Sequence, residues 1–356
     1  MLVTGGTGTL GRELVARLNR DGRATVVVLT RHPAAAAAVL PPNVRTLAGD
    51  VRDEGFGLAP AVRSELASRV TDILHCAAET TFNRPLAEAR AANVDGTRAV
   101  LDFARDCAHL ERLACFSTVY VAGRSTGCFT EADIGGTDGF VNSYEQSKAE
   151  METVVRDAMS ALPVALYRLS TIIGQSSTGA VTGFNAVHHA LRLLYQGLAP
   201  MVPGRESTLV DLIPVDFAAD AAHHVFEHDF TPGGTFHFCS GVESSATLGA
   251  LLDATIAAFE RHRPAWRKRS IARPALVELE TYDLFARSVE EAGNEVLLQA
   301  TRAVQAFAYQ LAYPKVFDAR NANAMLATAD IQAPPVLDYY DRVVRWCIET
   351  NWAALV

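Results

Sequence analysis

The first half of the chain alternates short apolar runs with segments in which apolar residues recur every three or four positions. Unbroken apolar, β-branched runs are typical of strands buried on both faces, and the longer period is typical of amphipathic helices. We expect strands at residues 2–3, 24–29, 44–47, 70–76, 113–118 and 164–169. Strands that alternate with helices predict a parallel sheet, and right-handed crossovers then make a doubly wound α/β fold.

A glycine-rich turn follows the first of these strands. Residues 3–11 are VTGGTGTLG, which places three glycines at GxxGxxG spacing before an expected helix. Glycine lets the backbone approach a pyrophosphate, and the helix N-terminus offers free N–H groups and the positive end of a dipole. The turn therefore predicts a Rossmann-like dinucleotide site. The cofactor-binding residues expected there are Gly5, Thr7, Gly8, Thr9, Leu10 and Gly11.

The end of the second strand indicates which nicotinamide cofactor binds. An acidic side chain there would bind the ribose 2′-hydroxyl of NAD, whereas an arginine would pair with the 2′-phosphate of NADP. The strand ends in VLTRH, with Arg31 and without an acid, so the sequence favours NADP(H). The alternative is that Arg31 is an ordinary solvated surface residue. Asp50 and Val51, after the third strand, are expected beside the adenine.

A tyrosine and a lysine four residues apart form the candidate catalytic pair. Tyr144 and Lys148 lie in SYEQSK, and residues four apart share one face of a helix. The ammonium group would lower the pKa of the tyrosine, which could then exchange a proton with a carbonyl or alcohol oxygen. Thr118 ends a buried strand at the edge where doubly wound proteins bind ligands, and its hydroxyl could bind the same oxygen. The alternative is an exposed Tyr/Lys pair that arose by chance.

Composition narrows the class of protein. The chain has 356 residues, of which 49% are hydrophobic, and its net charge of −8 argues against nucleic acid as the main partner. The six cysteines form no CxxC pair, so we expect reduced thiols in a cytoplasmic protein and no metal site. No apolar run approaches the roughly 20 residues of a membrane span. We expect no signal peptide, because the first motif begins at residue 3.

Together these motifs resemble those of the extended short-chain dehydrogenase/reductases. Besides the glycine turn and Tyr144/Lys148, the matching segments are CAA at 76–78, AANVDGT at 91–97 and STVYVAG at 117–123. The resemblance implies that Thr118, Tyr144 and Lys148 are the catalytic trio, with Lys148 also binding the nicotinamide ribose. It further implies that Ala77 and Ala78 line the cofactor site and that Asn93 supports the proton relay.

Further segments are similar to thioester reductases and fatty acyl-CoA reductases. They lie at residues 49–58, 167–179, 210–221, 234–241 and 313–322. One departure is Arg168-Leu169, where the family has Arg-Pro; this could alter the backbone beside the nicotinamide. The resemblance implies NADPH-dependent reduction of an acyl thioester to an aldehyde, and in some members onward to an alcohol.

Other functions stay open at this point. The same trio would serve a ketone or aldehyde reductase, or a hydroxysteroid-type dehydrogenase. A nucleotide-sugar epimerase or dehydratase is disfavoured, because those enzymes usually resemble the NAD-binding branch and Arg31 argues for NADP. A non-catalytic NADP-sensing protein is disfavoured by the intact trio. No carrier-protein or adenylation module accompanies the domain in this sequence, so an acyl donor on CoA or on an acyl carrier protein would arrive in trans.

The second half of the chain changes rhythm. We expect residues 1–180 to be the NADP-binding Rossmann core, and residues 181–356 to be a smaller, mainly helical substrate-binding region, interleaved with late Rossmann elements at about 210–241. The apolar stripe at 297–311 is either core or a lid over an acyl chain. A basic segment, residues 260–273, includes Arg267, Lys268 and Arg269. It is either a solvated loop or a landing site for the phosphates of CoA or of an acyl carrier protein.

Overall fold

A seven-stranded parallel sheet forms the centre of the protein. The structure is a computed structural model that describes residues 1–22, 24–269 and 271–353. The strands are ordered β12-β7-β5-β4-β1-β2-β3, and every neighbouring pair is parallel. Their bounds are β1 Leu2–Thr4, β2 Val27–Thr30, β3 Arg45–Ala48, β4 Asp72–His75, β5 Arg112–Thr118, β7 Val164–Leu169 and β12 Thr235–Phe238. The chain order reverses between β1 and β4, which confirms the doubly wound fold and marks the ligand-binding switch point.

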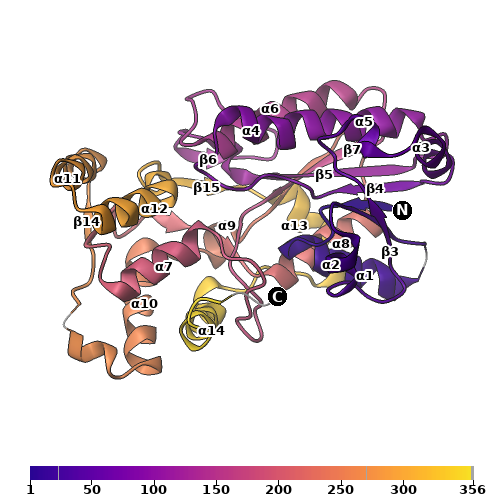
Figure 1. Cartoon of the computed structure of the whole chain (residues 1–356). Helices are drawn as coiled ribbons and strands as arrows, with labels where there is room; N and C mark the ends of the chain where they lie inside the picture. The colour runs from indigo at the N-terminus through magenta and orange to yellow at the C-terminus, as the bar shows by residue number, and fades with distance from the viewer. Residues whose placement is uncertain (23, 270, 354–356) are drawn as a thin grey trace.

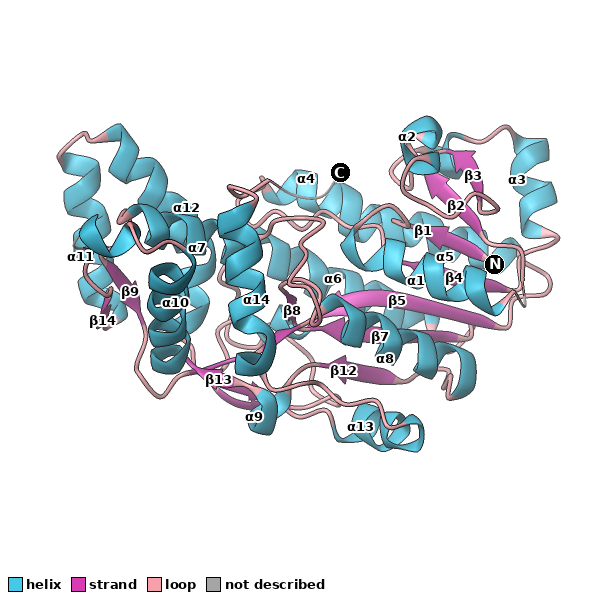
Figure 2. Ribbon diagram, turned by 90° about the horizontal axis from the view of Figure 1, so that it is seen from below, coloured by secondary structure: helices cyan, strands magenta, loops and turns pink. Residues whose placement is uncertain are grey.

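Helices cover both faces of this sheet (Figures 1 and 2). On one face lie α3 (Pro60–Ala67), α4 (Leu86–Arg90), α5 (Gly96–Asp106) and α6 (Ser143–Ala158), and on the other lie α1 (Thr9–Asp21), α8 (Val215–His228) and α13 (Arg320–Leu326). Each face buries its own apolar cluster, because alternate residues of a strand point to opposite sides. The short α2 (Pro33–Ala37) follows β2.

The C-terminal helices pack around a third apolar cluster beyond the carboxyl ends of the strands. They are α7 (Ala186–Gln196), α10 (Leu248–His262), α11 (Leu279–Glu291), α12 (Glu295–Leu311) and α14 (Val336–Glu349). Val304, Ala308 and Leu311 of α12 are buried in this cluster, so that part of the expected apolar stripe is core. Among the described residues, no helix is long and apolar enough to cross a membrane.

Short strand pairs lie outside the main sheet. They are β6 (Gly127–Phe129) with β15 (Lys315–Phe317), β8 (Thr171–Ile172) with β11 (Leu212–Ile213), β9 (Met201–Pro203) with β14 (Ala275–Val277), and β10 (Leu209–Val210) with β13 (Ala246–Thr247). β11 pairs with β8 and not with the main sheet. One further short helix, α9 (Gly241–Ser244), follows β12. β6 follows β5 in the chain, so its pairing with β15 brings residues 315–317 near the carboxyl end of β5.

A fully buried arginine of β7 links the sheet to α6 near this end of the sheet. The Arg168 guanidinium of β7 is 0% exposed and donates to both carboxylate oxygens of Glu152 on α6, at 2.9 and 2.7 Å. It also donates to the Asp133 carbonyl at 2.8 Å and lies over the Phe129 ring. Leu169, where a proline was expected from the family pattern, continues β7 in register with Thr118. The departure from Arg-Pro therefore leaves an ordinary strand end.

The buried pair predicts an asymmetric response to mutation. Arg168→Met should lower the free energy of unfolding by about 3–5 kcal/mol, because the buried Glu152 loses both of its hydrogen bonds from Arg168 and keeps only the longer contact with Arg156, at 3.7 Å. Adding Glu152→Gln should recover part of that loss. Urea unfolding of the native protein, the single variant and the double variant measures both effects. If the double variant is less stable than Arg168→Met, the pair is not coupled in this way.

Candidate functional site

The glycine turn forms the corner between β1 and α1. Gly5 has a φ of +69°, and a Cβ there would lie 2.5 Å from the Ala77 backbone nitrogen. A Cβ at Gly11 would lie 2.2 Å from the Gly5 carbonyl oxygen. These two glycines are therefore required by the close packing of the turn itself. Ala77 follows β4, so the turn meets the end of β4 at the switch point of the sheet.

The turn also fits a pyrophosphate. A Cβ at Gly8 would have no contact closer than the Gly5 carbonyl at 3.4 Å, and Gly8 is exposed, so the backbone is open on that side. No described side chain caps α1, and its first turn has no acidic residue. The free N–H groups and the dipole of this helix end suit an anion. Leu10 differs from the other turn residues, because its side chain is buried in the core.

Basic and acidic side chains follow the ends of β2 and β3. Arg31 follows β2 and is exposed, as the sequence predicts. Asp50 accepts two hydrogen bonds from the Arg52 guanidinium, the shorter at 2.6 Å, and this pairing lowers the pKa of the carboxyl; Arg31 contributes to the same effect. Val51 is buried. Arg52 is a second cation near the expected ribose end that sequence analysis missed.

Asn93 holds the segment after β4 against α6. It is 1% exposed and lies in a single π-helical turn, Ala91–Asp95. Its Oδ1 accepts the Glu79 N–H at 2.8 Å, while its Nδ2 donates to the Glu79 carbonyl and to Ser147 Oγ, both at 2.9 Å. Ser147 lies between the two candidate catalytic residues of α6. Asn93 is therefore a positioning residue for both Ala77–Ala78 and the catalytic helix.

The structure brings Thr118, Tyr144 and Lys148 together at the carboxyl end of β5. Thr118 Oγ1 donates to the Leu169 carbonyl at 3.1 Å and is also hydrogen-bonded to Tyr144. The Lys148 ammonium is 4% exposed and donates to the Phe116 carbonyl at 2.5 Å. Tyr144 and Lys148 sit one turn apart on α6, which begins with Asn142 as its N-cap.

The pKa of Tyr144 departs from the expected direction. Burial raises the pKa of Tyr144 to about 12, while its hydrogen bond with Thr118 opposes the rise. Burial also lowers the pKa of Lys148 to about 8. The expected lowering by Lys148 is therefore wrong for this arrangement, because the ammonium donates to the Phe116 carbonyl and desolvation of the phenol dominates.

A buried carboxyl group and a partly buried lysine lie near the trio, and sequence analysis missed them. Glu145 is 0% exposed and accepts the Val141 N–H at 2.9 Å; burial raises its pKa to about 7, and Lys315 opposes the rise. The Lys315 ammonium donates to the Gly123 carbonyl, and burial lowers its pKa to about 8. Nothing local in the sequence links residues 145 and 315, since the pairing of β15 with β6 brings them together.

An aromatic residue borders Tyr144, the candidate catalytic tyrosine. The Phe82 ring stacks on Tyr144 with centroids 5.5 Å apart. Ser143 Oγ donates to the carbonyls of Phe82 and Arg84, at 3.1 and 2.7 Å, and so holds the segment after Ala78 on the N-terminus of α6. Phe82 thereby forms one wall around Tyr144. Its place in the sequence, in a loop without periodicity, gave no signal of this role.

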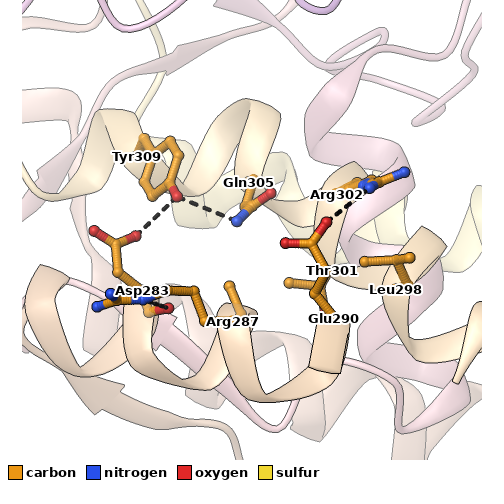
Figure 3. A pocket seen from close by; sticks show the side chains of 9 residues that line it. Asp283, Arg287, Glu290, Leu298, Thr301, Arg302, Gln305 and Tyr309 are labelled. Carbon is orange, nitrogen blue, oxygen red and sulfur yellow. Dashed lines mark hydrogen bonds and ion pairs between the residues drawn. The ribbon is translucent and has the colours of Figure 1, made fainter. Parts of the chain in front are cut away.

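A groove lies apart from the trio and the glycine turn. It has a volume of about 490 Å³ between α11 and α12, at the end of the molecule away from the sheet. Figure 3 shows Tyr309 and Gln305 of α12 facing Asp283 of α11, with Arg302 paired to Glu290 farther along. The polar groups in this view are paired with one another, and no residue of the glycine turn or trio lines the groove. We place the chemistry at the strand ends instead.

Some described residues of the basic segment are bonded within the chain, whereas Arg267 and Lys268 are exposed, as both interpretations of the segment allow. Trp266 is buried and its indole N–H donates to the Tyr195 carbonyl at 2.7 Å. Arg269 donates to the Tyr195 and Gln196 carbonyls, and Arg273 pairs with Asp253 and Glu206. These contacts favour a structural role for the segment over a phosphate landing site.

Comparison with known proteins agrees with this geometry. A family model described as "Male sterility protein" matches residues 3–222, which contain the glycine turn and the trio. A curated relative, "Glycine betaine reductase ATRR" of Emericella nidulans, is 27% identical over 263 residues; the match covers 67% of this chain but only 20% of that protein.

Two solved structures share the fold. The terminal R domain from the myxalamid PKS-NRPS biosynthetic pathway superposes with a TM-score of 0.78 at 22% identity, covering 99% of this chain and 91% of that one. A thiolation-reductase di-domain from an archaeal non-ribosomal peptide synthetase gives 0.73 at 16% identity, covering 99% and 75%. Because the family model spans more than half of the chain, the protein belongs to the male sterility protein family, an NAD(P)-binding group of extended short-chain dehydrogenase/reductases.

Proposed function

We propose that this protein reduces an acyl thioester, bound to CoA or to a carrier protein, to an aldehyde with NADPH. The observation that carries the proposal is the Thr118–Tyr144–Lys148 group at the carboxyl end of β5, next to a glycine turn that fits a pyrophosphate. The thioester part is supported by the relatives, whose names include a reductase and a thiolation-reductase di-domain.

The chain's own residues have distinct tasks in this reaction. The hydroxyl of Tyr144, and that of Thr118 once it turns from the Leu169 carbonyl, would donate hydrogen bonds to the carbonyl oxygen of the thioester and stabilise the negative charge that develops there. Tyr144 would then give that oxygen its proton, which completes a hemithioacetal. Cleavage of the C–S bond would release the thiol of CoA or of the carrier, with that proton transferred to sulfur, and leave the aldehyde. The pKa of Tyr144, raised to about 12, keeps it protonated at neutral pH, so it is a proton donor before reduction begins. The nicotinamide, when bound, supplies the hydride.

Lys148 has a separate task. Its ammonium is held between Phe116 and the face of α6 that carries Tyr144. There it would bind the nicotinamide ribose and supply positive charge as the proton leaves Tyr144. Asn93 positions the segment after β4 through Glu79, and it positions α6 through Ser147.

A preference for NADP over NAD is supported by Arg31 and by the pairing of Asp50 with Arg52. Arg31 follows β2 in the position that would meet a 2′-phosphate. Asp50, the nearest acid described, is already paired with Arg52. A carboxylate engaged by a guanidinium is poorly placed to accept a hydrogen bond from a ribose 2′-hydroxyl.

The activity is tested by NADPH oxidation with the purified full chain against three substrate groups: acyl-CoA and acyl-carrier thioesters, aldehydes, and ketones. Product identification shows whether reduction stops at the aldehyde or continues to the alcohol. The proposal requires an acyl thioester to yield aldehyde or alcohol. Reduction of a ketone without any thioester would favour the alternative, a carbonyl reductase or hydroxysteroid-type dehydrogenase that uses the same trio.

Tyr144→Phe should lower kcat by about 10²-fold or more, because it removes the proton donor while keeping the ring that stacks on Phe82. Fluorescence titration with NADPH should show nearly native binding. Tyr309→Phe, which removes a hydroxyl bonded to Asp283 in the distant groove, is the matched control and should keep native turnover. Near-native turnover by Tyr144→Phe would assign the proton to another group.

Arg31→Ala should weaken NADPH binding by about 10- to 100-fold, the cost of losing a charge-assisted hydrogen bond to phosphate. NADH binding should change little, because NADH lacks that phosphate. Titration of both cofactors measures the ratio. Arg20→Ala, an exposed arginine near the far end of α1, controls for net charge. Equal affinity of the native protein for NADH and NADPH would refute the assignment.

The pH profile of reduction should reflect Lys148. Burial lowers its pKa to about 8, so the ammonium is present below that pH and is lost as the pH rises through it. We expect kcat/KM for reduction to fall above pH about 8. Lys148→Arg keeps the charge at all working pH values and should move that fall upward, whatever its effect on the maximum rate. A native profile without a fall up to about pH 9.5 contradicts this role.

A further inference from the structure

We propose that Gln310 of α12 is a substrate-binding residue whose side-chain amide binds an amide group of the thioester substrate, in a small cavity beside the catalytic trio. The inference rests on the thioester reduction proposed above. It adds a recognition element on the C-terminal helices to the chemistry of the strand ends.

The cavity lies where α12 meets the edge of the Rossmann core. Its wall includes Tyr120, Asp211 and Lys315 from the core, and Phe307 and Gln310 from α12. About 20 Å³ is free inside it, which is room for roughly one water molecule. Phe307, which lines the cavity from α12, is only partly buried.

Gln310 is the polar group of this wall that lacks a partner. It is 6% exposed, and within the described part of the chain neither its Oε1 nor its Nε2 has a hydrogen-bond partner. A buried amide with both atoms unpaired costs free energy in the folded protein, which is unusual unless a ligand or water pairs it.

The neighbouring polar groups are, in contrast, engaged. The Tyr120 hydroxyl is hydrogen-bonded to Thr171 Oγ1 at 3.2 Å. Asp211 accepts the backbone N–H groups of Ser240 and Gly241, both at 2.9 Å. The Lys315 ammonium donates to the Gly123 carbonyl. Gln310 thus differs from these three groups, because both polar atoms of its side chain are buried and unpaired.

One lining residue, Tyr120, is bonded to the catalytic trio. The Tyr120 backbone N–H donates to Thr118 Oγ1 at 3.2 Å, so the residue that lines the cavity is fixed to the one expected to bind the thioester carbonyl. On the other side, Lys315 acts on Glu145, which follows Tyr144. A substrate whose carbonyl meets Thr118 and Tyr144 would extend past Tyr120 toward Gln310.

The unpaired atoms define the chemistry of the ligand. A carboxamide presents an acceptor and a donor side by side, which complements the N–H and C=O of a secondary amide. A hydrocarbon chain would leave both atoms unpaired. Secondary amides occur in the pantetheine arm of CoA and carrier proteins, and also in a peptidyl acyl group, so the shared class is an amide-bearing thioester.

The test compares the native full chain with Gln310→Met, which keeps the volume and removes the hydrogen bonds. Four probes separate the sources: a hexanoyl thioester of N-acetylcysteamine, an N-acetyl-aminoacyl ethyl thioester, hexanoyl ethyl thioester, and hexanal. We expect KM to rise about tenfold for one of the two amide-bearing probes, with kcat nearly unchanged. The probe that responds identifies the arm or the acyl group as the source. The last two probes should change less than about twofold.

Two controls keep the result interpretable. Gln305→Met lies on the same helix, but its amide donates to Tyr309 in the distant groove at 3.1 Å, so it should not change KM for any probe. The melting temperature of Gln310→Met should be native or higher, since an unpaired buried amide is replaced by an apolar group.

Three results overturn the inference while leaving thioester reduction intact: an equal response of all probes, no response of either amide-bearing probe, or a lower melting temperature that reveals a partner for Gln310 in the folded protein. Failure of the native chain to reduce any thioester, with hexanal reduced, overturns the proposed function itself and this inference with it.

Discussion

The candidate site depends on one side-chain amide, that of Asn93. Its three hydrogen bonds join the backbone after β4 to α6, and Asn93 itself lies in the π-helical turn between α4 and α5. The Cys76–Ala77 backbone packs against Gly5, so the same contact relates the glycine turn to Tyr144 and Lys148. Ser143 adds a second link, because its hydroxyl holds the Phe82 and Arg84 carbonyls on the N-terminus of α6.

Two lysines far apart in the sequence complete the arrangement. Lys148 from α6 donates to the Phe116 carbonyl, and Lys315 from β15 donates to the Gly123 carbonyl. The seven residues that follow Phe116 are therefore held at both ends by buried cations, with Thr118 and Tyr120 between them. Burying an ammonium carries a desolvation cost, and it lowers the pKa of each lysine. Both lysines bear that desolvation cost at the segment that carries Thr118.

Local sequence signals were sufficient for the sheet and for the trio. The glycine spacing, the apolar runs and the Tyr144/Lys148 spacing each lie within a few residues, so their consequences do not depend on the rest of the fold. β2 begins at Val27, three residues later than the apolar run suggests, because pairing with β1 and β3 sets its length. Lys315, Phe82 and Gln310 could not be identified from sequence, since their roles come from contacts between distant segments. The direction of the Tyr144 pKa was misjudged for the same reason: burial is a property of the assembled site.

The π-helical turn at Ala91–Asp95 has a consequence for how this site can change in evolution. There the Gly96 N–H donates to the Ala91 carbonyl, five residues back, where an α-helix would use four. The turn thus contains one residue more than a regular helix needs. Deleting one residue would rotate the two sides of the turn relative to each other by about 100°. Either the Asn93 amide would then turn away from Glu79, or α5 would turn its apolar face away from the core. Single-residue gaps at this point should therefore be rare among relatives that keep the reaction, even though the helix would tolerate them geometrically.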